Sequence, residues 1–260
     1  MDRRAVVGWM GAMLLGGCGG GGGGADAPLV NGGGTGGASG GTSGAGGAGG
    51  ASAGGTPPVT TPPATPAPAP SVPLSSNVAV WGDSLTWGYA PQLQQAMPNR
   101  DVFNGGVIGD TSTQAADRQV ADTGHRDWVN VFWYGHNNQK DNERIKADIA
   151  RSVATLAPGN THFLVLSLVN QATAEEQRGG PDYPGILQLN ADLAALYPQN
   201  YFDMRSWMVG QYDPNNQQDV IDFQNDVPPS SIRFDKIHLT LDGYVLVGKK
   251  VKELIEARGW

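Results

Sequence analysis

A tract built almost wholly of glycine, alanine, serine, threonine and proline occupies residues 19–72 and most constrains what this chain can fold into. Such a segment cannot bury enough apolar surface to offset the chain entropy that folding would remove. The sequence therefore predicts a disordered tether over residues 19–72 and a single folded domain over residues 73–260. A domain of that size can bury a hydrophobic core of its own.

The residues ahead of the tether have the order of a secretory signal peptide. Arg3 and Arg4 precede an apolar run over residues 5–15, and small residues then lead to Cys18. The apolar run is too short for a comfortable transmembrane helix. Leu15-Gly-Gly-Cys18 resembles the bacterial lipobox, which implies that residues 1–18 are a lipoprotein signal peptide with its lipobox cysteine, cleaved before Cys18, and that lipid is attached to Cys18. A plain secretory signal with a chance cysteine is the alternative interpretation.

The lipobox resemblance also implies a location. Glycine rather than aspartate follows Cys18, so we expect an exported protein, lipid-anchored in the bacterial cell envelope at the outer membrane or cell surface. A coil with the composition of the tether would span roughly 40 Å or more. Cys18 is the only cysteine of the chain, so we expect the domain to fold without disulfides.

The charge of the folded part argues against a nucleic-acid partner. The chain has 17 basic and 24 acidic residues, and two of each precede residue 73, so the folded part keeps the net charge of -7. Its densest basic group, Lys249, Lys250 and Lys252, lies in an expected helix, where a solvated face is the simpler interpretation. We expect a small-molecule or polysaccharide partner, and we favour a monomer.

Short apolar runs alternate with helical stretches along the folded part. The expected strands are residues 77–81, 101–103, 128–133, 162–168 and, more briefly, 200–203. The expected helices are residues 91–97, 113–121, 143–156, 184–196 and 240–257. This alternation predicts an α/β fold, a three-layer α/β/α sandwich with a central parallel sheet. In such sheets, working residues gather at the carboxyl ends of the strands.

The histidines are the residues to weigh first, because a hydroxyl nucleophile needs one as base and an acid to orient it. Of the other three histidines, His125 lies in an expected loop beside Arg126, His162 opens an expected strand, and His136 has no carboxylate at a telling spacing; a surface or satisfied core position is the simpler interpretation of each. The fourth, His238, differs because Asp235 stands three residues before it, ahead of the last expected helix. That spacing can bring a carboxylate to Nδ1 while Nε2 stays free.

Four blocks of this chain resemble, in the same order, the four blocks of the GDSL or SGNH hydrolase family. They are Gly82-Asp-Ser84-Leu-Thr, Asn104-Gly-Gly-Val-Ile-Gly109-Asp-Thr-Ser112, Gly135-His-Asn137 and Asp235-Lys-Ile-His238-Leu. Alone, the first block could be a capped turn. Together the blocks cover nearly all of the folded part, and they imply the flavodoxin-like SGNH hydrolase fold. Asn138 stands where members commonly carry aspartate, which leaves the packing of that loop open.

The resemblance implies acyl transfer without a metal or an organic cofactor. Ser84 would attack an ester carbonyl, His238 would take its proton, and Asp235 would hold the imidazole in the right tautomer. The resemblance assigns the oxyanion donors to the backbone N–H of Ser84, the backbone N–H of Gly109 and the side-chain amide of Asn137.

The expected function is therefore that of a serine hydrolase acting on ester bonds outside the cell, with short acyl groups such as acetyl on carbohydrate as the expected substrate. A lipase, lysophospholipase or thioesterase on longer acyl chains is one alternative. A classical α/β-hydrolase is weaker, because its nucleophile elbow ends in glycine where Thr86 stands. A non-catalytic surface module that binds glycan, with a decayed site, is another alternative, and Asn138 is its only support.

Two further groups of residues leave two interpretations each. Trp81, Trp87, Trp133 and Tyr134 flank the expected site, either as a sugar-binding surface or as core packing. Asp213, Asn215, Asp219, Asp222 and Asp226 crowd one segment, but the glycine of a calcium loop is missing, which favours a polar loop with a short helix.

Overall fold

The computed structural model describes residues 73–260, so the expected signal peptide with Cys18 and the expected tether lie outside the described residues. Five strands form one sheet: β1 Val78–Gly82, β2 Val102–Gly106, β3 Val129–Trp133, β4 Phe163–Leu166 and β5 Tyr201–Phe202. All their pairings are parallel, in the order β2-β1-β3-β4-β5. This is the flavodoxin-like order of doubly wound sheets, and it confirms the predicted parallel α/β fold.

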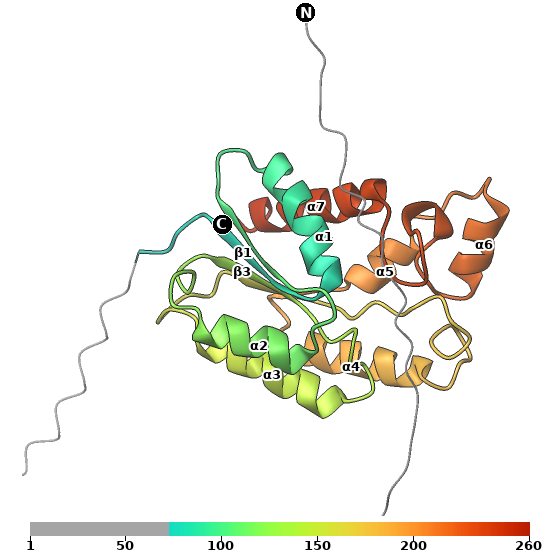
Figure 1. Cartoon of the computed structure of the whole chain (residues 1–260), viewed down its shortest axis with the longest axis horizontal. Coiled ribbons are helices and arrows are strands. Elements are labelled where there is room, and N and C mark those ends of the chain that lie inside the picture. The colour runs from blue at the N-terminus through green and yellow to red at the C-terminus, as the bar shows by residue number, and fades with distance from the viewer. Residues whose placement is uncertain (1–72) are drawn as a thin grey trace, which may run out of the picture. The chain divides into compact units, whose positions relative to one another are not determined.

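Helices cover both faces of this sheet. They are α1 Ser84–Ala96, α2 Ser112–Ala121, α3 Asn142–Ala154, α4 Tyr183–Leu196, α5 Met204–Val209, α6 Gln217–Gln224 and α7 Leu241–Glu256, with a 3-10 turn, η1, at Ser230–Ile232. Figure 1 shows α1, α5 and α7 on one side of the sheet and α2, α3 and α4 on the other, which confirms the three layers. None of the helices within residues 73–260 is long and apolar enough to cross a membrane.

Two separate cores lie against the two faces of the sheet, because successive side chains of a strand point to opposite faces. In β1, Val78 and Val80 join the core under α1 and α7, whereas Ala79 and Trp81 join the core under α2, α3 and α4. All four side chains are at most 3% exposed. A strand buried on both faces reads as a near-continuous apolar run, which explains why β1 and β3 can be recognised in the sequence.

The first helix begins earlier than the predicted range of residues 91–97. It begins at Ser84, capped by Asp83, whose side chain accepts the backbone N–H of Leu85 at 3.0 Å. Pro91 resembles a helix start in the sequence, but it lies inside α1. A proline cannot bond the carbonyl four residues before it, and that carbonyl, of Trp87, instead accepts from Asn104 Nδ2 at 3.2 Å.

Candidate active site

The structure brings three of the predicted site residues together at the carboxyl end of β1. Ser84 lies two residues after the end of β1, and its Oγ lies 2.9 Å from Nε2 of His238, a residue 154 positions later in the chain. Nδ1 of His238 lies 2.7 Å from Oδ2 of Asp235. The carboxylate can only accept, so Nδ1 carries the proton and Nε2 is free to accept the hydroxyl proton of Ser84. This is the arrangement of a serine–histidine–aspartate triad.

The loop that carries Asp235 is held by its own backbone and by an arginine. Oδ1 of Asp235 accepts the backbone N–H groups of Ile237 at 2.8 Å and of His238 at 2.7 Å. Arg233 donates from Nη1 to the Asp235 carbonyl oxygen at 2.8 Å, and its Nη2 lies 2.8 Å from Oδ2 of Asp222. The carboxylate is thus oriented before any substrate arrives. Sequence reasoning missed Arg233 because its role depends on these tertiary contacts.

The hydrogen bonds also set the charge of Asp235. Burial by itself would raise the pKa of this carboxyl, but the bonds from the Ile237 N–H and from the ring and N–H of His238 outweigh burial and hold the pKa below its usual value. Asp235 therefore stays ionised over the pH range in which histidine side chains bind a proton.

We expect ester hydrolysis to fall when the pH is lowered from about 8 to about 5, because an imidazolium cannot accept the Ser84 proton. Since Asp235 stays charged, one proton uptake should produce the loss, with a limiting slope of one in a plot of log kcat/KM against pH. Circular dichroism at each pH controls for unfolding. A flat profile over this range in a folded protein would contradict His238 as base.

Two predicted oxyanion donors lie on the loops after β2 and β3. Gly109 has a left-handed φ of +83°, and no atom lies within 4 Å of the place where its Cβ would stand. One amide N–H of Asn137 donates to the Asp110 carbonyl oxygen at 2.8 Å. The other N–H remains available for a substrate oxygen. The third predicted donor, the N–H of Ser84, belongs to the first turn of α1, where backbone N–H groups lack an intrahelical partner.

Arg118 on α2 stabilises the loop that contains Gly109 through hydrogen bonds and an ion pair. The sequence does not reveal this role. Its Nη2 donates to the carbonyl oxygens of Gly82 at 3.1 Å and of Gly105 at 2.8 Å, the ends of β1 and β2. The guanidinium also forms an ion pair with Asp110. Burial lowers the pKa of Arg118, but arginine still carries its charge.

Asn138 has a specific role in the packing of the loop after β3, the point that the sequence left open. Its Oδ1 accepts the Ser112 backbone N–H at 2.9 Å, and its Nδ2 donates to Ser112 Oγ at 2.9 Å. Ser112 Oγ in turn lies 2.8 Å from Oδ2 of Asp148, which is 2% exposed. The single hydroxyl proton goes to Asp148, so Ser112 needs an N–H donor on its other side. An asparagine supplies that donor and an aspartate does not.

Replacing Asn138 by aspartate should therefore destabilise the fold by about 1–3 kcal/mol, because two carboxylates would compete for one hydroxyl proton. Thermal unfolding of the wild type and the variant measures this loss. Exchanging the partners in the double variant Asn138→Asp/Asp148→Asn restores one donor and one acceptor and should recover part of the stability. Equal stability of the wild type and the single variant would refute this role.

The other three histidines are satisfied by neighbours, and the carboxylate that bonds His136 is 53 positions away in the chain, so no sequence spacing indicates it. Nδ1 of His136 lies 2.8 Å from Oδ2 of Asp83. Nδ1 of His125 lies 2.9 Å from Oδ2 of Asp122. Like His238, His125 thus has a carboxylate three residues before it, which sequence reasoning overlooked. His162 stacks on Trp260 with ring centroids 5.0 Å apart.

The flanking aromatic residues divide into core and surface. Trp81, Trp133 and Tyr134 are at most 3% exposed and pack in the core. Trp87, three residues after Ser84 in α1, is 54% exposed, and Phe234 is 69% exposed and stacks on the His238 ring with centroids 5.8 Å apart. Only Trp87 of the four expected aromatic residues is thus accessible, and Phe234 was not expected.

The crowded acidic residues are used in structural contacts. Both oxygens of Asp219 accept from side-chain hydroxyls, Oδ1 from Ser230 and Oδ2 from Ser231. Asp222 pairs with Arg233, as above, and Asp226 forms an ion pair with Arg205. Within residues 73–260, no group of three side chains of the metal-ligating kinds could hold an ion.

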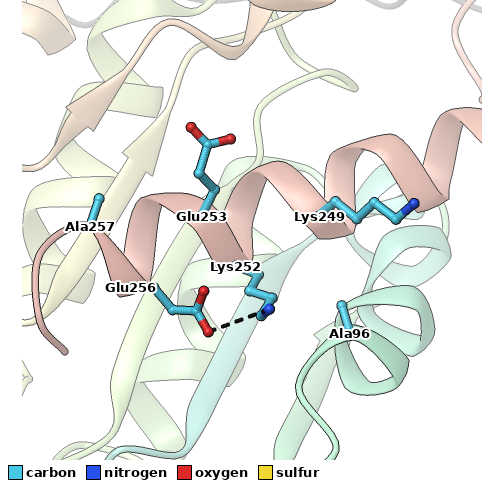
Figure 2. Close-up of a pocket in the computed structure, with 6 residues that line it drawn as sticks. All are labelled: Ala96, Lys249, Lys252, Glu253, Glu256 and Ala257. Atoms are coloured by element: carbon cyan, nitrogen blue, oxygen red, sulfur yellow. Dashed lines mark ion pairs between the residues drawn. The ribbon is translucent and has the colours of Figure 1, made fainter.

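A surface hollow between α1 and α7 lies away from this site (Figure 2). It is lined by Ala96 of α1 and by charged side chains near the end of α7, where Lys252 pairs with Glu256 at 3.5 Å. Ser84 lies at the other end of α1, and His238 precedes the other end of α7. With a rise of about 1.5 Å per residue, Ala96 lies about 18 Å along α1 from Ser84, and Lys249 lies about 12 Å along α7 from its first residue.

Known proteins resemble this chain more in fold than in sequence. No model of a protein family matches the chain. A "Tail spike protein" of Salmonella phage epsilon15 is 27% identical over 150 residues, a match that spans 52% of this chain and 14% of the phage protein. The chain thus spans a small part of that relative, and the match carries no argument about activity.

Solved structures match far more of the described domain. The lipase/acylhydrolase from Enterococcus faecalis is 15% identical with a TM-score of 0.53, covering 71% of this chain and 97% of that one. The acetyl xylan esterase AlAXEase is 15% identical with a TM-score of 0.54, covering 68% and 98%. A member of the lipolytic protein G-D-S-L family from Veillonella parvula is 15% identical with a TM-score of 0.50, covering 69% and 97%. Residues 73–260 therefore have the fold of the GDSL/SGNH hydrolases.

Proposed function

We propose that this protein is a serine esterase that cleaves carboxylic esters through an acyl-enzyme on Ser84. The observation that carries the proposal is the continuous hydrogen-bonded chain from Ser84 Oγ through His238 to Asp235, built at the carboxyl end of a parallel sheet. The likeness in fold to proteins described as acylhydrolases and esterases supports the same chemistry. Asn138 gives no support to a decayed site, since its contacts explain its presence.

The proposed reaction has two steps, acylation of Ser84 and hydrolysis of the acyl-enzyme. His238 Nε2 accepts the proton of Ser84 as Oγ adds to the ester carbonyl, and Asp235 stabilises the imidazolium that forms. The amide of Asn137 and the N–H groups of Gly109 and Ser84 receive the oxyanion, each contributing about 3 kcal/mol to lowering the barrier. His238 then protonates the leaving alcohol, and water, deprotonated by the same ring, releases the acid.

For the substrate, we propose short acyl groups, above all acetyl, on carbohydrate. Trp87 and Phe234 support this class, because exposed aromatic faces beside a reactive serine suit the apolar faces of sugar rings. The acetyl xylan esterase among the similar structures is a protein of that kind by its name. The expected place of the protein outside the cell fits a polysaccharide substrate.

A panel of nitrophenyl acetate, butyrate and palmitate, together with acetylated and chemically deacetylated xylan, tests both levels of the proposal. We expect fast release of acetate from the polysaccharide and no turnover of palmitate. Turnover of palmitate above acetate would favour the lipase alternative and overturn the substrate class alone. Failure to hydrolyse any ester, by protein with the expected circular dichroism spectrum, would overturn the esterase proposal.

We also propose that lipid at Cys18 holds the enzyme in the bacterial cell envelope. The support is the order of the first residues: basic, apolar, then Leu-Gly-Gly-Cys. Labelling expressing cells with a radioactive fatty acid tests this, since label should enter the wild type and not the Cys18→Ser variant. Equal label in both would contradict it.

A further inference from the structure

The side chain before Ser84 and the side chain before Asn137 are joined by a buried hydrogen bond. Nδ1 of His136 lies 2.8 Å from Oδ2 of Asp83, although the two residues are 53 positions apart. Asp83 is fully buried and His136 is 7% exposed. The bond therefore connects the turn of the predicted nucleophile with the loop of a predicted oxyanion donor, out of reach of solvent.

Each member of this pair has a second bond that fixes its state. Oδ1 of Asp83 accepts the Leu85 N–H at 3.0 Å and caps α1. Nε2 of His136 accepts the Val169 N–H at 3.2 Å, in the loop after β4. Because Nε2 accepts, the proton of the neutral ring stands on Nδ1 and is donated to Asp83. In an imidazolium, the N–H at Nε2 would face the N–H of Val169, so that two donors would meet.

We propose that Asp83 and His136 form a positioning couple that sets the distance between Ser84 and the Asn137 amide, and that neither touches the substrate. This inference rests on the proposed esterase function. Ser84 and Asn137 each follow a member of the couple in the chain, so a shift of either member displaces the nucleophile relative to the oxyanion donor. A misplacement of about 1 Å in such a geometry lowers a rate about 10²-fold.

The test uses variants of the full chain that remove or replace the ring. His136→Phe keeps a ring but loses both nitrogens, and it should lower kcat about 10²-fold with KM within about threefold. His136→Gln has an amide N–H for Asp83 and an amide oxygen for Val169, so it should recover at least about tenfold of that loss. Ser152→Ala is the matched control: it removes a buried 2.6 Å bond to the Tyr134 hydroxyl on the α3 side of the sheet, and kcat should stay within about twofold.

A double-variant cycle with Asn137→Ala distinguishes positioning from general destabilisation. If His136 acts through Asn137, then His136→Phe should cost less than about threefold once the amide is absent, although it costs about 10²-fold in its presence. Thermal unfolding of each variant shows that it is folded at the assay temperature. Nitrogen-15 NMR of the wild-type imidazoles, which needs no activity, should show a neutral ring protonated at Nδ1 that is lost in His136→Gln.

The outcomes separate the two proposals. Additive losses in the cycle, or a His136 ring protonated at Nε2, would overturn the couple while leaving an active esterase intact. If His136→Phe does not fold, the cycle is run with Asp83→Asn, in which the amide oxygen stays on the Leu85 N–H and two donors must therefore meet at Nδ1 or at Nε2 of the ring. A folded wild type that cleaves no ester overturns the esterase and the positioning role together.

Discussion

Replacing Ser84 by alanine should lower kcat for acetyl esters by a factor of about 10³ or more. The substitution removes the oxygen that lies 2.9 Å from Nε2 of His238 and that can form a bond to the acyl carbon. Water could still be activated by the ring, and the oxyanion donors would remain, so a residual rate above background is expected. Steady-state kinetics with nitrophenyl acetate measure the loss.

Two controls make this result specific to Ser84. The variant should unfold at nearly the temperature of the wild type, since the side chain is only half-buried and its bond is to a surface-facing ring. Ser75→Ala, at the opposite end of β1, removes a hydroxyl that accepts the Asn77 N–H at 3.1 Å and should leave kcat unchanged. Near-normal turnover by Ser84→Ala would rule out Ser84 as nucleophile.

Replacing Asp235 by asparagine should lower kcat by about 10³- to 10⁴-fold, because the structure forces the imidazole into the wrong tautomer. Oδ1 of Asp235 accepts two backbone N–H groups, so the amide oxygen of an asparagine must keep that place. Its NH₂ group then faces Nδ1 of His238, which has to accept. The ring proton moves to Nε2, where it opposes the Ser84 hydroxyl instead of receiving its proton.

The chain offers a matched control for this variant in a second Asp-x-x-His pair. Asp122 lies 2.9 Å from Nδ1 of His125. Both residues precede β3, so they lie at the amino ends of the parallel strands, whereas the site lies at the carboxyl ends. Asp122→Asn makes the same chemical change and should leave kcat within about twofold. If both variants lose activity equally, the loss reflects stability, and if Asp235→Asn keeps turnover within tenfold of the wild type, the triad is wrong.

The strands β1 and β3 and the members of the triad could be predicted because each lies in a short, recognisable block of the chain, whereas the pairing of Ser84 with His238 was predicted from the resemblance in motifs. A strand that is buried on both faces is a run of apolar residues, and the turn after β1 and the loop before α7 each hold their residues within a short block. The tether boundary and the lipid anchor rest on composition and remain predictions.

Asn138 and Arg118, which sequence reasoning missed, act through contacts between distant segments. Nothing near Asn138 shows that it faces a serine whose hydroxyl is already committed to Asp148. The predicted start of α1 was wrong for a related reason: Pro91 is tolerated inside the helix because Asn104 of β2 bonds the Trp87 carbonyl that the proline leaves free. Such partners become visible only when the sheet order is known.

Mass spectrometry of the intact protein after treatment with a fluorophosphonate tests the central claim most directly. The reagent phosphonylates a serine only where a base and oxyanion donors activate it. The esterase account predicts one adduct per chain, on the peptide that contains Ser84, with none in Ser84→Ala and slow formation in Asp235→Asn. No adduct on the folded wild type, under conditions that label a known serine hydrolase, would contradict it.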